Sequence, residues 1–244
     1  MATVRDFFEY INTIAPVDTQ EEWDNSGMLV GDMNAEVKKA VVVLDIDEWA
    51  VEKAKALGAN LIISHHPVIF SAMKKFTMGC VPFELAANSI SAICCHTPLD
   101  IADGGTNDTL AELLGFNAYK GENPIIRYAD IKETNATALA DLLAEKLDTK
   151  VRFADAGNTI KKVAICTGGG ASLMWEAGKI DAFITGDAKH NDFLDAFGAG
   201  ISLFAAGHYE TEFPVVPVLR NKLQAEFNEI EIIDIKQENP VKFA

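Results

Sequence analysis

Residues 38–64 constrain the fold of this chain more than any other stretch, because they hold two short apolar runs separated by one helical segment. The runs are AVVVL and LIIS, and the segment DEWAVEKAKALG between them has helical periodicity and ends at Gly58. This pattern predicts a strand, a helix and a second strand. A connection of this length between two buried strands is normally a right-handed parallel crossover. The stretch therefore predicts a parallel βαβ unit.

A second stretch, residues 161–187, repeats the pattern with different residues and reads KKVAICTGGGASLMWEAGKIDAFITGD. Lys161 and Lys162 align with the lysines at 38 and 39, Gly178 aligns with Gly58, and AFIT aligns with LIIS. The separations agree within about two residues, which indicates internal duplication of one βαβ unit. The alternative is chance similarity between two βαβ units of separate origin. The duplication predicts two related α/β lobes.

Other segments continue the alternation of strands and helices. Further strands are predicted at 91–96, 125–131, 151–155, 201–207 and 229–235, and a short one within 21–32. Helices are predicted at 3–14, 82–88, 106–115, 135–147, 189–198 and 217–227. This alternation is typical of the α/β class. Since no Ser- or Pro-rich linker interrupts this alternation, we expect one domain over 1–244 that consists of two packed lobes. The first lobe comprises about 1–123 together with about 206–244, and the second comprises about 124–205.

The charge balance argues against nucleic acid as a partner. The chain of 244 residues has 21 basic and 36 acidic side chains, a formal net charge of -15, whereas binding to phosphate backbones needs a basic surface. No run of about 18 apolar residues occurs, so no membrane span is expected. The N-terminus lacks the apolar core of a signal peptide, and the four cysteines form no CxxC pair, so we expect a cytoplasmic protein with buried thiols.

Candidate metal ligands follow four of the predicted strands. LIIS is followed by His65 and His66, AICC by His96, SLFAAG by His208, and AFIT by Gly186 and Asp187 with His190 three residues further. A carboxylate stands four residues after two of these histidines, Asp100 after His96 and Glu212 after His208. In an open α/β sheet, ligands gather at the carboxyl ends of the strands. Because these positions account for all five histidines, they predict a shared metal site.

The spacing of these residues favours two metal ions. Neighbouring side chains on a strand point to opposite faces, but Pro67 is expected to end the pairing and let His65 and His66 turn toward one cavity, each facing its own ion. Asp100 could bridge two ions about 3.5 to 4 Å apart, and His208 and Glu212 lie on one face of a helical turn. Imidazole with carboxylate suits zinc, manganese, iron, cobalt or nickel.

Each of these patterns also has a reading without a metal. The pair His65 and His66 could be satisfied by hydrogen bonds within a loop, and His96 could be bonded to backbone or lie beside the ligands instead of ligating. The sequence TGGG at 167–170 resembles an anion-binding turn, but it lacks the Lys-Ser/Thr of a P-loop and the full dinucleotide fingerprint. No GxSxG sequence is present, and no cysteine has the context of a nucleophile, so nucleophilic catalysis is disfavoured.

Five short motifs together resemble one protein family. They are WDNSGMLVGD at 23–32, SHHP at 64–67, HTPLDIADGGTNDTLAELLG at 96–115, TGD at 185–187 and GHYETE at 207–212. In this order they are similar to the NIF3-like family, whose members are named GTP cyclohydrolase 1 type 2 homologues. The similarity spans 23–212.

The resemblance implies a two-lobed α/β fold around a dinuclear metal centre, and a toroidal homohexamer. Carried onto this sequence, it implies that His65, His66, Asp100, His208 and Glu212 are the metal ligands. His96 would lie beside the metals as a ligand or as a supporting group, and Trp23 and Asn25 would lie near the site as substrate-binding candidates. Longer members carry an inserted domain, so this chain resembles the short form. The family often has a histidine where this chain has Asn191, one residue after His190.

These expectations lead to a functional hypothesis and one alternative. The hypothesis is a metal-dependent hydrolase in which two divalent ions activate a bridging water for attack on carbon or phosphorus of a small molecule, as in a cyclohydrolase, phosphoesterase or amidohydrolase. The alternative is a metal-binding or metallochaperone-like assembly protein without turnover. A hydrolase screen with several added metals discriminates between them.

Overall fold

The computed structural model describes residues 1–242, which form two compact units. Unit 1 comprises Met1–Ala102 and Val216–Glu238, and unit 2 comprises Asp103–Val215 with the segment from Asn239 onward. The sequence places the lobe boundaries near 123/124 and 205/206, so the units of the structure divide at other positions. The physical reason is packing: the helix after Asp103 buries Leu110 and Leu114 in the core of unit 2.

Unit 1 is built on a five-stranded sheet in the order β1-β4-β3-β2-β11. Its strands are β1 (Gly27–Val30), β2 (Lys39–Val43), β3 (Leu61–Ser64), β4 (Ser91–Cys94) and β11 (Glu231–Asp234). Strands β4, β3, β2 and β11 pair in parallel in this order, and β1 joins the edge antiparallel to β4. Every residue of β3 and β4 is buried, which explains why both read as continuous apolar runs.

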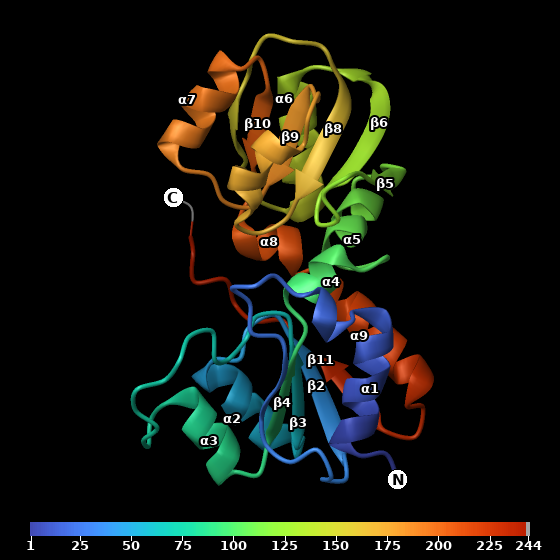
Figure 1. Ribbon diagram of the computed structural model, residues 1–244, viewed down its shortest axis with the longest axis vertical. Helices are drawn as coiled ribbons and strands as arrows, with labels where there is room; N and C mark the ends of the chain where they lie inside the picture. The colour runs from blue at the N-terminus through green and yellow to red at the C-terminus, as the bar shows by residue number, and fades with distance from the viewer. Residues whose placement is uncertain (243–244) are drawn as a thin grey trace. The chain divides into compact units, whose positions relative to one another are not determined.

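Helices cover both faces of this sheet (Figure 1). The helices α2 (Glu48–Leu57) and α3 (Val81–Ala87) pack against Val41, Val43 and Ile62 on one face. The helices α1 (Val4–Ile14) and α9 (Val215–Glu226) lie at the other face, where the ring of Phe7 stacks on that of Phe227 with centroids 3.8 Å apart. Two layers of helix therefore enclose the sheet, and α2 of the predicted βαβ unit belongs to one of them.

Local sequence signals explain where α2 begins and ends. Its N-cap Asp47 accepts a hydrogen bond from the backbone N–H of Ala50 through its side chain, and its C-cap Gly58 adopts φ 71°, in the left-handed region that favours glycine. Strand β3 then starts three residues later and pairs with β2 in parallel, with Val43 opposite Ser64. The predicted strand–helix–strand unit at 38–64 is thus confirmed.

Unit 2 contains a six-stranded sheet in the order β5-β6-β8-β9-β10-β7. Its strands are β5 (Ala118–Lys120), β6 (Arg127–Thr134), β7 (Arg152–Ala154), β8 (Ile160–Cys166), β9 (Ala182–Thr185) and β10 (Ser202–Ala205). The central strands β8, β9 and β10 are parallel, and β7 and β6 are antiparallel additions on either side. The helices α5 (Thr106–Leu113) and α6 (Ala136–Leu147) pack against Val163, Ile165 and Ile184 on one face.

The second βαβ unit differs from the first in its helix. Strands β8 and β9 are parallel as expected, but they are joined by a 3-10 helix, η2 (Gly170–Glu176), and not by an α-helix. The N-cap Gly169 offers no side-chain hydrogen bond, and the three glycines at 168–170 disfavour a helical start. Both units contain three successive parallel strands, and their common origin by duplication stays a prediction.

The remaining elements are short, and several were not predicted. They are η1 (Val17–Thr19), α4 (Thr97–Ile101), α7 (His190–Gly198) and α8 (His208–Glu212). The sequence predicts α7 and the helical turn of α8, whereas η1, α4 and β5 have three to five residues each and carry little periodicity of their own. Among the described residues, every helix is too short or too polar to cross a membrane.

Parallel pairing brings the carboxyl ends of the strands to one edge in each sheet. In unit 1, β2, β3 and β4 end in register, with Val43 opposite Ser64 and Ser64 opposite Cys94. In unit 2, Cys166 of β8 and Ala205 of β10 both pair with Thr185 of β9. The loops and short helices that follow these strands carry the candidate ligands, as the sequence predicts.

Candidate metal centre

Three imidazoles gather at the carboxyl edge of the unit 1 sheet. The ring centroids of His65 and His66 are 4.9 Å apart. The ring centroid of His96 lies 5.2 Å from that of His65 and 5.5 Å from that of His66. One ring nitrogen from each of the three lies within 4.8 Å of the others, which is close enough for one cation to reach them. The predicted gathering of these histidines is therefore confirmed within unit 1.

Backbone hydrogen bonds hold these histidines just beyond the strands. The N–H of His65 donates to the carbonyl of Val43 at 3.3 Å, and that of His66 donates to the carbonyl of Leu44 at 2.9 Å. The pairing of β3 with the β2 chain thus continues past Ser64 before Pro67 ends it. His65 is buried and His66 is partly exposed, so the two neighbouring rings meet different environments although they face one cluster.

Each of these rings is oriented through its Nδ1 atom. Nδ1 of His65 lies 3.1 Å from the carbonyl oxygen of Cys95, Nδ1 of His66 lies 2.8 Å from Oδ1 of Asp45, and Nδ1 of His96 lies 2.8 Å from Oδ1 of Asp24. Carbonyl and carboxylate oxygens accept hydrogen bonds, so these partners assign the ring proton to Nδ1. Nε2 then carries the lone pair that a metal ion needs.

Asp24 is the most strongly bound of these partners. Its side chain is fully buried, and its Oδ2 accepts from Thr97 Oγ1 at 2.6 Å, from the Thr97 N–H at 3.1 Å and from Ser26 Oγ at 2.9 Å. Burial alone raises the pKa of a carboxyl, but the hydrogen bonds from His96, Thr97 and Ser26 outweigh it and hold the pKa of Asp24 well below its usual range. Asp24 therefore stays ionised and fixes His96.

Asp100 brings a carboxylate to the same edge. It belongs to α4, which begins directly after His96, and its Oδ1 lies 3.7 Å from Nε2 of His65. Its backbone N–H donates to the His96 carbonyl at 3.3 Å, so one helical turn separates the two side chains. The predicted ligand Asp100 thus faces the Nε2 atom of a predicted ligand histidine.

Unit 2 repeats this arrangement with His208 and Glu212. Both side chains belong to α8, and Nε2 of His208 lies 3.1 Å from Oε2 of Glu212. Nδ1 of His208 lies 2.8 Å from Oδ2 of Asp187, which follows β9. The Glu212 side chain is only 5% exposed, so its carboxylate is withdrawn from water beside an imidazole. The predicted i, i+4 pair therefore has the geometry of two ligands that can share one cation.

The substrate-binding candidates Trp23 and Asn25 occupy different positions. The ring of Trp23 is 58% exposed and its centroid lies 5.8 Å from that of His96. The ring of Phe70 lies 6.0 Å from Trp23, on the segment that follows Pro67. Asn25 donates from Nδ2 to the carbonyl of Ile69 at 2.6 Å and so ties this segment to the chain beside the site. A substrate-binding role for Trp23 and Asn25 stays a prediction.

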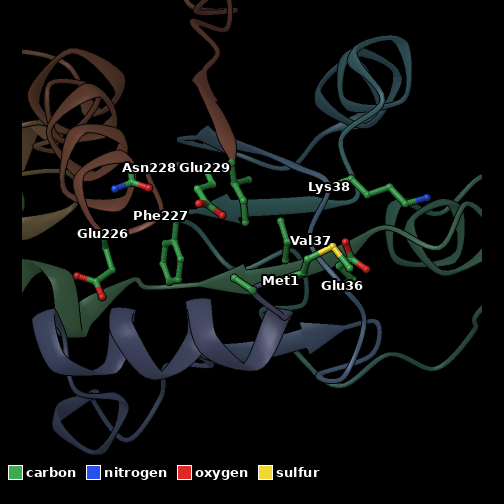
Figure 2. A pocket seen from close by; sticks show the side chains of 10 residues that line it. Met1, Glu36, Val37, Lys38, Glu226, Phe227, Asn228 and Glu229 are labelled. Carbon is green, nitrogen blue, oxygen red and sulfur yellow. The ribbon is translucent and has the colours of Figure 1, made fainter.

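Other sequence candidates lie elsewhere. His190 is the first residue of α7, both it and Asn191 are exposed, and within residues 1–242 His190 joins no cluster of metal-competent side chains. A hollow of about 440 Å³ in unit 1 opens at the amino ends of β2 and β11, where Figure 2 shows Glu36, Glu226 and Glu229 around it. Its described lining has no histidine or cysteine, so the metal-competent residues of unit 1 lie at the opposite edge of the sheet.

The sequence does not indicate which carboxylate orients which histidine. Asp45 follows β2 by two residues, so the same strand-end rule that found His65 would have found it if it had been applied to β2. Asp24 is 72 residues from His96 in the chain, and only its place in the WDNSG motif marks it. Asp187 follows a predicted strand together with His190, but its carboxylate contacts Nδ1 of His208.

Two α/β units, each with imidazoles and carboxylates beyond the ends of parallel strands, define a candidate metal-binding α/β protein. The chain belongs to the Duf34/NIF3 (NGG1p interacting factor 3) family, whose model matches residues 2–240. This confirms the family resemblance seen in the sequence.

Relatives and solved structures agree with this assignment over nearly the whole chain. A "GTP cyclohydrolase 1 type 2 homolog" of Clostridium perfringens is 33% identical over 98% of this chain and 99% of that protein. One of the same name from Campylobacter jejuni is 35% identical over 85% of this chain and 86% of that protein. Among solved structures, Staphylococcus aureus protein SA1388 has a TM-score of 0.90 at 25% identity, covering 100% of this chain and 99% of that one. Reduced HcgD from Methanocaldococcus jannaschii has a TM-score of 0.85 at 27% identity, covering 97% and 98%.

Proposed function

We propose that this protein binds two divalent metal ions through His65, His66, Asp100, His208 and Glu212, and that it is a metal-dependent hydrolase. The observation that carries the proposal is the orientation of the histidines. In His65, His66 and His208, Nδ1 contacts a carbonyl or carboxylate oxygen at 2.8 to 3.1 Å. Histidines that bind metals almost always have such a partner, because it fixes the tautomer and raises the basicity of Nε2.

The donor set suits borderline divalent ions. Imidazole nitrogens with carboxylate oxygens fit zinc, manganese, iron, cobalt or nickel, and the set contains no thiolate ligand. The nearby thiols support this choice, since burial, and then the nearby Asp100 charge, raise the pKa of Cys95 to about 12 and keep it protonated. When bound, such ions supply Lewis acidity toward a water molecule or a substrate oxygen.

The residues of the chain contribute binding and proton transfer. Asp24 holds the proton of His96 on Nδ1, so Nε2 of His96 can accept the proton that a water molecule loses when it attacks an electrophilic carbon or phosphorus. We therefore assign His96 the position beside the ligands, as the proton acceptor. The exposed rings of Trp23 and Phe70 next to His96 offer an apolar wall for a small-molecule substrate.

The names of the relatives favour a cyclohydrolase among the hydrolases. Proteins of Helicobacter pylori that are 32% identical over 87% of this chain are named "GTP cyclohydrolase 1 type 2". A cyclohydrolase adds water to a ring carbon and opens a C–N bond, which requires the proton acceptor and electrophilic activation proposed for this site. GTP is therefore the first compound to assay, with phosphoesters and amides as the next classes.

The assembly proposed from the family resemblance is a toroidal homohexamer, and the location proposed from the sequence is the cytoplasm. A chain with a net charge of -15 and no strongly basic segment has no feature that favours nucleic acid as an alternative partner. Light scattering coupled to size-exclusion chromatography measures the assembly directly. A mass near six chains supports the proposal, and a monomer at micromolar concentration contradicts it.

Metal analysis followed by turnover assays tests the function. Protein purified without chelators is expected to contain about two divalent ions per chain, and well under one ion per chain after loading with zinc, manganese, iron and cobalt would refute the metal site. Turnover with at least one metal and its loss in His96→Gln support a hydrolase. Tight metal retention without turnover on any substrate class would favour a metal-binding assembly protein instead.

A further inference from the structure

The TGGG sequence at 167–170 lies against the ligand pair of unit 2. It follows β8 and leads into η2, and none of the nucleotide motifs accounts for it. Gly168 is buried and has φ 60°, in the left-handed region where glycine carries no steric penalty. Its neighbour Gly169 has φ -84° and is exposed. The backbone conformation therefore favours glycine at position 168 but does not require it at position 169.

The space beside Gly168 is filled by a proposed metal ligand. A Cβ atom at Gly168 would overlap Oε1 of Glu212, would lie 2.8 Å from its Cδ, and would lie 3.1 Å from Nε2 of His208. A Cβ atom at Gly169 would find its nearest neighbour, Cε1 of His208, at 4.0 Å, an ordinary van der Waals distance. The carboxylate of Glu212 thus occupies the volume that any side chain at position 168 would take.

The backbone of Gly168 also holds the residue that orients His208. Its carbonyl accepts from the backbone N–H groups of Gly186 at 3.0 Å and Asp187 at 2.8 Å, and the Asp187 carboxylate contacts Nδ1 of His208. Its own N–H donates to Oγ1 of Thr211, the residue before Glu212, at 3.1 Å. One residue therefore joins the end of β8, the end of β9 and the helix α8.

We propose that Gly168 is a positioning residue for the metal ligands His208 and Glu212, which places the Glu212 carboxylate beside Nε2 of His208 because it has no side chain. This inference rests on the proposed metal-binding function. A side chain at position 168 displaces the carboxylate, which is the flexible end of Glu212, and it also strains the left-handed backbone, so the test must separate these two costs.

Metal titration of two variants at position 168 and a matched control tests this assignment. Gly168→Ala is expected to weaken binding of zinc or manganese by about 10- to 100-fold, as measured by calorimetry, because a displaced ligand loses its orientation. Gly168→Asn should weaken it equally, since asparagine tolerates the left-handed backbone but still carries a Cβ atom. Gly169→Ala should bind like the wild type. Near-wild-type binding by Gly168→Asn would overturn the assignment and leave backbone strain as the cause.

A double-mutant cycle with Glu212→Asp separates positioning from a general structural role. Aspartate is shorter by one methylene group, which makes room for a Cβ atom at position 168. If Gly168 acts through Glu212, adding Gly168→Ala to Glu212→Asp has little further effect on metal affinity, whereas additive losses would overturn the assignment. Circular dichroism confirms that the variants are folded. A wild-type protein that binds no metal refutes the proposed function itself, while a wild type that binds metal no better than Gly168→Ala refutes only this inference.

Discussion

Replacing Asp24 by asparagine is expected to destabilise the protein and to disable His96 as the proposed proton acceptor. The carboxylate is fully buried, with Oδ1 2.8 Å from Nδ1 of His96 and Oδ2 accepting from Ser26 and twice from Thr97. An amide has a single acceptor oxygen, so its NH2 group must face a donor on one side. If it faces His96, the ring proton must move to Nε2, and the lone pair there is lost.

The magnitude follows from the bonds that change. The variant loses at least one hydrogen bond to a charged acceptor and leaves a buried donor unsatisfied, which together amount to about 3 kcal/mol in the free energy of unfolding. Urea unfolding of the metal-free protein measures this as a lower midpoint at an unchanged slope. Tryptophan fluorescence is a suitable probe, because Trp23 and Trp49 both lie in unit 1. Turnover of the metal-loaded protein should fall by about 10²- to 10⁴-fold, the usual effect of losing a proton acceptor, because Nε2 of His96 then carries a proton.

Asp45→Asn provides the matched control. Asp45 contacts Nδ1 of His66 at the same 2.8 Å, but its side chain is 51% exposed. Water can replace its hydrogen bonds, so the free energy of unfolding should change by less than about 0.5 kcal/mol, while metal affinity still falls. Equal destabilisation by the two substitutions, or an Asp24→Asn variant as stable as the wild type, would refute the argument from burial.

Three further outcomes are expected from the described residues. The pKa of Asp24 is depressed in the folded protein, so its contribution to stability is complete above the unfolded-state pKa near 3.8 and is lost as pH falls below that value. Acid titration of the metal-free wild type should therefore show a decline in stability that Asp24→Asn lacks. Thiol reagents should modify Cys80 first and reach the three buried cysteines, including Cys95 with its pKa raised to about 12, only on unfolding, which Cys80→Ser tests by removing the fast phase. Phe7→Ala should lower the free energy of unfolding by about 3 to 5 kcal/mol, because Phe7 is fully buried against Phe227, and a loss under 1 kcal/mol in urea titration would contradict that packing.

The sequence predicted what depends on local pattern. The parallel unit of β2, α2 and β3 was readable because its apolar runs, its cap Asp47 and its closing Gly58 all lie within 30 residues of one another. The gathering of His65, His66 and His96 followed from one topological rule, that parallel strands end at one edge. Elements of three to five residues, such as α4 and β5, were missed because so few residues show no periodicity.

The periodicity and spacing of the sequence could not predict contacts between distant segments. The bond between Asp24 and His96 spans 72 residues, and nothing near either residue specifies the other. The close approach of Gly168 to Glu212 joins residues 44 positions apart through the pairing of β8, β9 and β10, which the spacing of glycines does not reveal. The segment of the 3-10 helix η2 was expected to form an α-helix. Its apolar spacing is compatible with both types of helix, and only the glycines that precede it distinguish them.

The two units are completed at different stages as the ribosome synthesises the chain. Unit 1 is discontinuous, since β11 pairs with β2 across almost 190 residues and Phe227 stacks on Phe7. While residues 103–215 emerge, the first 102 residues lack the edge strand and one covering helix, and β2 is left with an unpaired edge. Unit 2 can complete its sheet earlier, because all six of its strands lie between residues 118 and 205. Synthesis therefore favours folding of the second unit before the first, and a chain truncated before Glu231 should leave the N-terminal half prone to aggregation.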